Sequence, residues 1–337
     1  MIRFYFFVVV MLILAGYTSC IQKNESSSDS QTNLEATDEL LNKITGAIEA
    51  NPNDDKLYIE RANYYLAIDS VTLALRDITL AIDINNQNPD HYIILSEAYL
   101  ALGNPDRCLE GLEKALEISP KNQEALLKKA HLFLIMRQYD KTYETIKELI
   151  AIDNFNPMAY YIRSFALLEQ GDTANAIRNL MVAIDQKQDY FEAFVQLGII
   201  YSSQKNPRAA DYLLTAIELK PESPEAYYQL GLFFQENGEP EKAIEIYNNI
   251  LNIEPRFTFA IYNLGYIYLV YFKEFGNAVN YFNRVLEIDP GNFEALYNRG
   301  YAYELMGKTE SAKNDYREVL ELKTNYKLAI EGLNRLE

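Results

Sequence analysis

Apolar residues recur at spacings of three and four positions along most of the chain, which is the spacing of one face of an α-helix. The stretch 260–290 shows this pattern most clearly, as two amphipathic segments that end at Pro290. The same pattern returns from residue 55 to residue 326 in steps of about 34 residues. The sequence therefore predicts an all-α fold in which helix pairs repeat in tandem as a solenoid.

Two columns of small residues mark the repeat. The first column lies near the start of each second helix and reads Ala74, Cys108, Thr142, Ala176, Ala209, Ala243, Ala278 and Ala312. The second lies in each first helix and reads Ala62, Ser96, Ala130, Ser164, Gly198, Gly231, Gly265 and Gly300. Large residues follow the first column by four positions, among them Tyr247, Phe282 and Tyr316. Small residues facing large ones let two helices pack closely.

This repeat resembles the tetratricopeptide repeat family over about 270 of the 337 residues. The signature is clearest in YYQLGLFFQENGEPEKAIEIYNNILNIEP (227–255) and LYNRGYAYELMGKTESAKNDY (296–316), with Tyr or Phe where the family often has Trp. The resemblance implies a right-handed superhelical solenoid of antiparallel helix pairs. The eight expected units span 55–88, 89–122, 123–156, 157–190, 191–223, 224–257, 258–292 and 293–326.

The N-terminus has the pattern of an export signal. Residues 1–19 contain Arg3 and then an apolar run that is too short to span a membrane, as in a signal peptide. Small residues before Cys20 resemble a bacterial lipoprotein signal of a Bacteroidetes-like source, in which Cys20 receives lipid. Residue 21 is not Asp, which favours an outer-membrane lipoprotein facing either the periplasm or the cell surface. The alternative is an ordinary cleaved signal with a chance cysteine.

Three further segments complete the expected organisation. Residues 20–33 are polar and Ser-rich, which predicts a flexible tether. Residues 34–54 and 327–337 each predict one amphipathic capping helix, which would cover the exposed end of the array.

The charge of the chain restricts its partners. The formal net charge is −17, which disfavours binding to nucleic acid and to anionic lipid headgroups. We therefore expect membrane contact through the N-terminal lipid alone, and attraction for basic segments of a partner.

Catalytic and cofactor chemistry is not indicated. His91 and His131 are the two histidines, and no Cys or carboxylate cluster accompanies them at metal-ligand spacing. Cys108 occupies a small-residue packing column, and the sequence has no Gly-rich phosphate loop. We predict a protein that is not an enzyme and that has no cofactor or metal.

The resemblance implies that the first helices line a concave groove, and in this chain that face carries tyrosines and side-chain amides. The candidate groove residues are Tyr161, Tyr228, Gln229, Tyr262, Asn263, Tyr266, Tyr297, Asn298 and Tyr301. Tyr supplies rigid contact area, and Asn or Gln can hydrogen-bond to a peptide backbone. We predict that the groove binds an extended peptide or a helix of another protein. The alternative is that a Tyr-rich composition simply decorates the helices.

Two turn features are of interest. The unit 258–292 has one extra residue in an aromatic turn, 271–275, which is either a contact loop or locally packed. Ser70 and Thr173 each follow an Asp in a turn, a pattern that resembles Bacteroidetes O-glycosylation, although turn and cap chemistry also explains it.

Three functional hypotheses follow. The first is a lipid-anchored adaptor that binds partner proteins through the groove. The second is a structural subunit of an envelope assembly or secretion complex that uses the convex face and the ends. The third is a glycan-binding module.

Overall fold

The computed structural model describes residues 29–337, and within this range the chain is helical without a strand. The expected signal peptide, Cys20 and most of the expected tether lie outside the described residues. None of the described helices is long and apolar enough to cross a membrane.

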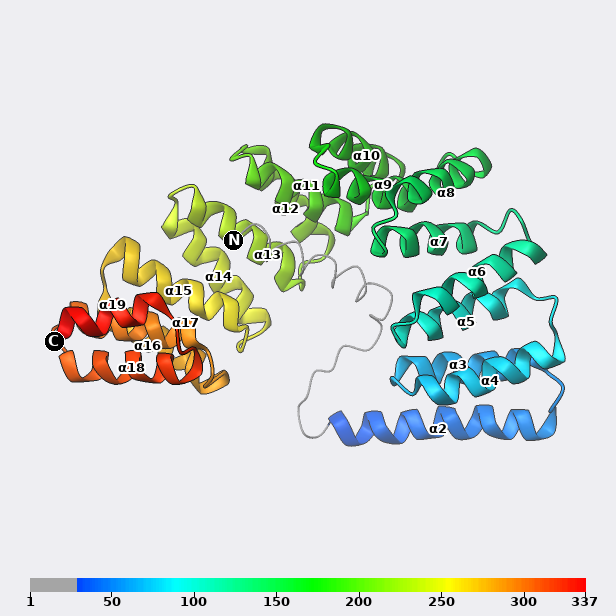
Figure 1. Ribbon diagram of the computed structural model, residues 1–337, viewed down its shortest axis with the longest axis horizontal. Helices are drawn as coiled ribbons and strands as arrows, with labels where there is room; N and C mark the ends of the chain where they lie inside the picture. Colours follow the sequence, from blue (N-terminus) through cyan, green and yellow to red (C-terminus); the bar gives the residue numbers. More distant parts are fainter. Residues whose placement is uncertain (1–28) are drawn as a thin grey trace. The chain divides into compact units, whose positions relative to one another are not determined.

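Each expected unit contains one first helix and one second helix (Figure 1). The first helices are α3 (Asp55–Ala67), α5 (Pro89–Ala101), α7 (Gln123–Ile135), α9 (Pro157–Glu169), α11 (Phe191–Ser203), α13 (Pro224–Glu236), α15 (Thr258–Ile267) and α17 (Phe293–Leu305). The second helices are α4 (Val71–Ile84), α6 (Pro105–Ile118), α8 (Tyr139–Ile152), α10 (Thr173–Gln186), α12 (Arg208–Leu219), α14 (Pro240–Ile253), α16 (Phe275–Ile288) and α18 (Thr309–Leu322).

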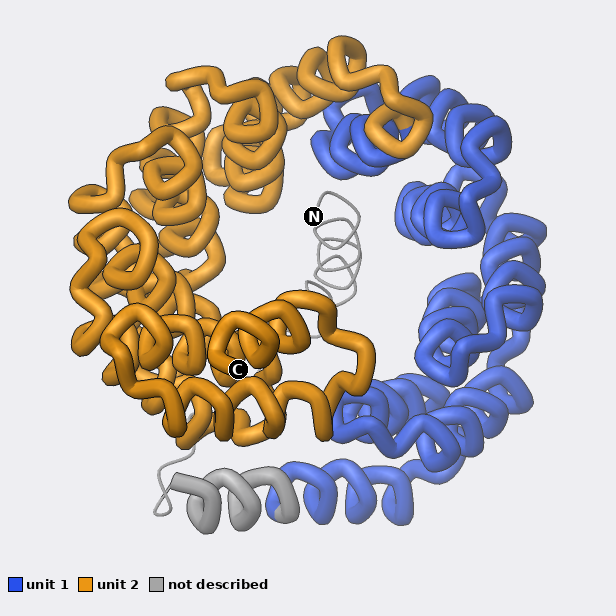
Figure 2. Tube along the Cα trace, turned by 60° about the vertical axis from the view of Figure 1, so that its left-hand side comes forward, with its two compact units in different colours: residues 1–166 blue, residues 167–337 orange. Residues whose placement is uncertain are grey.

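The chain forms two compact units, residues 1–166 and residues 167–337, and the division falls within α9 (Figure 2). Inside each unit, helices pack on their neighbours along the chain. In unit 1, for example, α4 contacts both α3 and α5, and in unit 2 α14 contacts both α13 and α15. Contacts between sequence neighbours are the mark of a solenoid.

Single helices flank the repeats at both ends. Helix α2 (Asp29–Ala50) packs Ile44 and Ile48 against Tyr58. It begins at Asp29 rather than at Leu34, inside the segment expected to be tether, because no Pro or Gly stands between the two positions to end the helix. Helix α19 (Lys327–Leu336) buries Ala329 in the last hydrophobic cluster of unit 2.

The two small-residue columns lie where helices approach most closely. Residues of the first column are buried, and Ala74, Ala243 and Ala312 are completely so. In the second column, a Cβ atom added to Gly231 would lie 2.5 Å from the Tyr247 ring. The corresponding distance at Gly265 is 2.9 Å, to the ring of Phe282. Only glycine leaves room for these rings, so the sequence pattern of small against large residues corresponds to real helix contacts.

Every turn between a first and a second helix contains one residue in the left-handed region. These residues are Asp69, Gly103, Arg137, Gly171, Lys205, Gly238, Lys273 and Gly307, with φ between 52° and 82°. Glycine adopts this conformation without a steric cost, and half of the turns use it. The shared conformation gives all repeats the same helix reversal.

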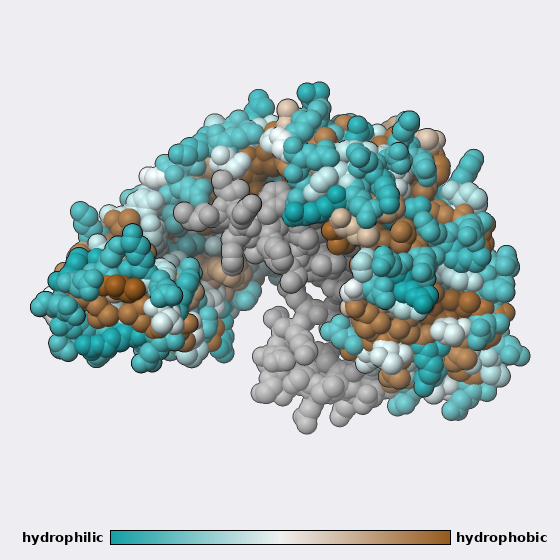
Figure 3. Space-filling view, viewed as in Figure 1, coloured by the Kyte–Doolittle hydropathy of each residue, from teal (hydrophilic) through white to brown (hydrophobic). Residues whose placement is uncertain are grey.

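In the view of Figure 3, both units present mainly hydrophilic residues, with apolar patches among them. This surface agrees with the acidic composition of the chain.

Candidate functional site

Eight of the nine candidate groove residues lie together in unit 2, on α13, α15 and α17. We call this set the tyrosine face: Tyr228, Gln229, Tyr262, Asn263, Tyr266, Tyr297, Asn298 and Tyr301. The tyrosines and Gln229 are half-buried, whereas Asn263 and Asn298 are buried, with 8% and 9% of their surface exposed. The face therefore presents phenol rings rather than amides.

Side-chain amides join consecutive repeats across this face. Asn298 Nδ2 donates to the Tyr262 hydroxyl at 2.7 Å, from α17 to α15. Asn263 Nδ2 lies 3.4 Å from the Tyr228 hydroxyl and also donates to the Tyr247 hydroxyl at 3.1 Å. Asn263 thus has both amide hydrogens engaged and can offer a ligand only its carbonyl oxygen, whereas the bond to Tyr262 uses one of the two amide hydrogens of Asn298.

A second set of hydrogen bonds surrounds Gln235 on α13, within repeat six and between repeats six and seven. The completely buried Tyr247 donates its hydroxyl proton to Gln235 Oε1 at 3.0 Å. Tyr271 donates its own hydroxyl proton to the backbone oxygen of Gln235 at 2.9 Å. The polar groups at this junction thus satisfy one another and fix α15 against α13 and α14.

The C-terminal end of the tyrosine face is a cluster of stacked rings. Tyr297 and Tyr301 are parallel with centroids 6.3 Å apart, and Tyr326 meets Tyr297 edge-on at 5.6 Å. Burial raises the pKa of the Tyr297 phenol, and it raises that of Tyr262 further still, so both are neutral near pH 7. Helix α19 closes this end, where Arg335 Nε donates to Glu304 Oε1 at 2.7 Å.

The face also includes two phenylalanines, which the sequence patterns did not single out. Tyr228 lies 5.7 Å from the Phe257 ring and 5.9 Å from the Phe259 ring. Phe259 is 63% exposed, although it begins a helix whose other apolar residues are largely buried. The sequence did carry one signal for this exposure. Phe259 occupies the second position of a first helix, where other repeats have Glu192, Glu225 or Glu294.

The remaining candidate residues lie elsewhere. Tyr161 is on α9 in unit 1, where its ring meets Phe165 edge-on at 4.9 Å. Ser70 precedes α4 and Thr173 begins α10, and both are half-buried in their turns. Asp172 accepts a hydrogen bond from the Asn175 backbone at 3.1 Å, which is cap chemistry.

The aromatic turn of repeat seven is mostly packed locally. Its extra residue is absorbed in a π-helical turn, Tyr268–Phe272. Tyr268 stacks on Tyr281 at 5.5 Å, and Phe272 packs on the core of repeat six. Val270 and Tyr271 remain 44% and 41% exposed at the tip.

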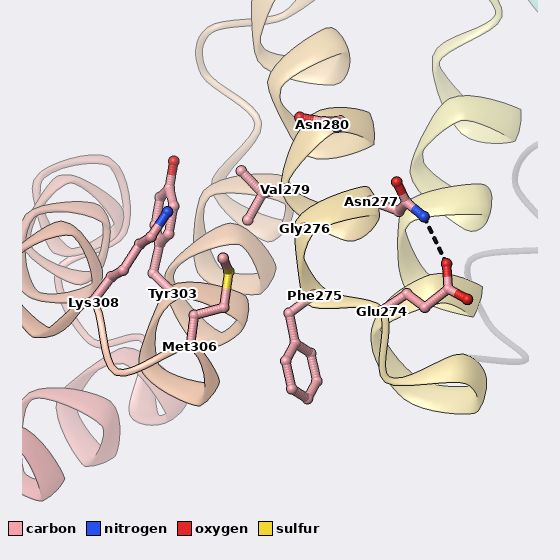
Figure 4. Close-up of a pocket in the computed structure, with 9 residues that line it drawn as sticks. All are labelled: Glu274, Phe275, Gly276, Asn277, Val279, Asn280, Tyr303, Met306 and Lys308. Carbon is pink, nitrogen blue, oxygen red and sulfur yellow. Dashed lines mark hydrogen bonds between the residues drawn. The ribbon is translucent and has the colours of Figure 1, made fainter.

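A depression of about 480 Å³ lies near this turn, between the start of α16 and the turn from α17 to α18. Figure 4 shows Phe275, Val279 and Met306 in it, with Lys308 and Tyr303 at one side, while Asn277 turns to bond Glu274 at 2.6 Å. No Ser, Cys or His lines it, so it offers no nucleophile paired with a histidine base.

The two histidines and Cys108 are the side chains best suited to acid–base or nucleophilic chemistry, and each lies in separate packed surroundings. His91 is buried beside Asp55, with Nε2 and Oδ2 3.1 Å apart. Burial, with Lys128 nearby, lowers the pKa of His131 to about 4. Burial raises the pKa of the Cys108 thiol to about 11. Within the described residues, no group of three His, Cys, Asp or Glu side chains is placed to hold a metal ion.

Comparison with known proteins agrees with this architecture. Models of the tetratricopeptide repeat match residues 89–132, 224–257, 260–292 and 281–314. A model of the CadC C-terminal domain matches residues 121–239. A comparison with curated proteins gives no match.

Two solved structures share the fold. One is the C-terminal part of a TPR repeat-containing protein from Cytophaga hutchinsonii, with 19% identity, a TM-score of 0.59, and coverage of 71% of this chain and 98% of that chain. The other is a tetratricopeptide repeat protein from Parabacteroides merdae, with 16% identity, a TM-score of 0.52, and coverage of 74% and 99%. The predicted fold class is thus confirmed, and the matched segments of the chain are tetratricopeptide repeats. Proteins built of such repeats bind other proteins or peptides and typically act as non-catalytic scaffolds.

Proposed function

We propose that the chain is a lipid-anchored scaffold of the bacterial cell envelope that binds an extended segment of a partner protein on its tyrosine face. The observation that carries this proposal is the exposure of aromatic surface there. Phe259 is 63% exposed beside half-buried tyrosines, and rigid rings with polar tips are well suited to protein recognition.

Site-specific photo-crosslinking tests the binding surface. Phe259, Tyr266 or Tyr301 would be replaced one at a time by p-benzoylphenylalanine in cells, and the adducts identified by mass spectrometry. We expect a common partner protein at these positions. Adducts that never form at any of the three would show the assignment to be wrong.

A second function, as a structural subunit that binds through a second-helix surface, is favoured by one observation in unit 1. Helix α4 exposes Leu73, Leu80 and Ile84, at 40%, 39% and 38%, and their spacing places them along one side of the helix. Photo-crosslinking from positions 73 and 80 is therefore the matched control. Adducts at these two positions alone would favour the second function over the first.

The anchor is proposed from the sequence before Cys20. Metabolic labelling with an alkyne fatty acid should modify the wild-type protein and not the Cys20→Ser variant, and membrane fractionation should find the former in the outer membrane. Equal labelling of both variants would contradict lipidation at this position.

A further inference from the structure

The first helices of unit 2 carry an excess of negative charge. Helices α11, α13, α15 and α17 contain one basic residue, Arg299, and five acidic ones: Glu192, Glu225, Glu236, Glu294 and Glu304. Arg299 is not available to a ligand, because its guanidinium donates to Asp315 at 2.7 Å and to Asn283 at 2.9 Å. The first helices α3, α5 and α7 of unit 1, by contrast, are nearly balanced, with five acidic and four basic residues.

Neighbouring helices neutralise some of these carboxylates and not others. Lys220 Nζ lies 2.9 Å from Glu192, and Arg335 pairs with Glu304. Lys323 lies over the Phe293 ring at 4.2 Å. Among the described residues, Glu225 and Glu294 form no ion pair, although Lys220 is close enough to Glu225 to oppose part of the rise in its pKa.

These two carboxylates flank the most exposed ring of the face. Glu225, Phe259 and Glu294 occupy the second position of three consecutive first helices. Glu294 is close enough to Tyr262 and Tyr326 to raise the pKa of both phenols, after the larger effect of burial. Burial first, and then the like charge of Glu192, raise the pKa of Glu225. A cation bound here would relieve this repulsion.

We infer that the tyrosine face selects a basic extended peptide, whose Lys or Arg side chains lie over Phe259 and the neighbouring tyrosines and pair with Glu225 and Glu294. This inference rests on the proposed function and specifies the chemistry of the partner. Cations bind over aromatic rings, and adjacent carboxylates strengthen the attraction and orient the ligand.

Fluorescence anisotropy with defined peptides tests the selection, using the full chain in detergent. The probe is a labelled dodecapeptide of alternating Lys and Thr, and the comparison peptides replace Lys with Gln or Glu. We expect the Lys peptide alone to bind, with an affinity that falls as salt is added.

Charge-neutralising variants locate the binding. The double variant Glu225→Gln/Glu294→Gln should weaken binding of the Lys peptide by about tenfold or more, since each charge-assisted contact is strong. The control Glu144→Gln/Glu148→Gln removes the same net charge from the exposed side of α8 and should bind as the wild type does. Tyr266→Phe should retain binding and Tyr266→Leu should reduce it, because only Phe preserves the aromatic ring. Circular dichroism would establish that all variants are folded.

Equal affinities of the two double variants, or equal binding of the Gln peptide, would overturn the inference. Crosslinks from positions 259, 266 and 301 to a partner would then still support the proposed function. Their absence would instead remove the proposed function itself.

Discussion

The first helices of repeats one to three in unit 1 and of repeats six to eight in unit 2 have the same fold but carry different side chains on one face. In repeats one to three of unit 1, the positions that correspond to the tyrosines hold Ile59, Ile93 and Leu127, and Ile93 is only 2% exposed, whereas repeat four has Tyr161. On this side Lys128 pairs with Glu97. In repeats six to eight of unit 2, the same positions hold Tyr228, Tyr262 and Tyr297, whereas repeat five has Val195.

The difference shows which positions the repeat itself determines. The small-residue columns are buried in both units because helix packing depends on them. The face positions are aliphatic in some repeats and phenolic in others without altering the helix pair. Function is therefore best sought where units of the same fold differ. Four predictions test this comparison.

The largest effect is expected from Arg61→Met in unit 1. Arg61 Nε lies 2.5 Å from Asp77, whose carboxylate is completely buried. Loss of Arg61 leaves the buried charge with only the exposed Arg76, at 3.7 Å, and should cost about 3 kcal/mol of the free energy of unfolding, measured by urea denaturation. Arg299→Met should cost less, because the equivalent pair with Asp315 is partly exposed. Arg61→Met/Asp77→Leu should recover most of the loss, and failure to do so would argue against a charge effect.

Gly231→Ala should destabilise unit 2 through steric overlap. The added methyl would lie 2.5 Å from the buried Tyr247 ring, and overpacking of this kind costs about 1–3 kcal/mol. Gly276→Ala on α16 is the matched control, since nothing lies within 4 Å of its Cβ position. That change should be neutral or slightly stabilising in the same urea experiment. Equal effects of both changes would contradict the steric explanation.

Tyr247→Phe should weaken the connection between repeats six and seven. The change removes the hydroxyl that accepts from Asn263 and donates to Gln235, at a cost of about 1–2 kcal/mol for a buried hydrogen-bonded group. Hydrogen exchange of α13 and α15 should increase more than that of α5 and α7. Tyr92→Phe, whose hydroxyl contacts only the exposed Asn86 oxygen at 3.2 Å, should leave exchange unchanged.

The smallest effect at neutral pH is expected for His131→Gln in unit 1. Burial lowers the pKa of His131 to about 4, below its ordinary value of 6.5, so the folded state favours the neutral ring. The wild type should therefore be fully stabilised above pH 6.5 and lose stability as the pH falls towards 4. Urea midpoints at pH 7.5 and 5.5 should show a smaller loss for the variant. The NMR signal of the His131 ring in the wild type gives the pKa directly, and a value near 6.5 would refute the prediction.

The sequence predicted most of the helix packing and less of the site. Periodicity identifies Gly231 and Tyr247 as contact positions because a helix places residues three and four apart on one side. It cannot show that the NH2 groups of Asn263 and Asn298 donate hydrogen bonds to tyrosines of the preceding repeat, since that depends on the distance between helices. Phe259 escaped notice for the same reason, because its exposure is decided by neighbours about one repeat away. The hydrogen bonds of the face are new observations. Peptide binding and lipidation of Cys20 stay predictions.

The hydrogen bonds from Asn263 and Asn298 have a kinetic consequence. They hold tyrosine rings of two successive repeats in place before any partner arrives, so little rotational freedom is left to lose on association. A partner would meet a pre-organised surface, and its lifetime there would depend on how well its own side chains match the spacing of the rings. Substitutions at the two asparagines should consequently change the dissociation rate more than the association rate.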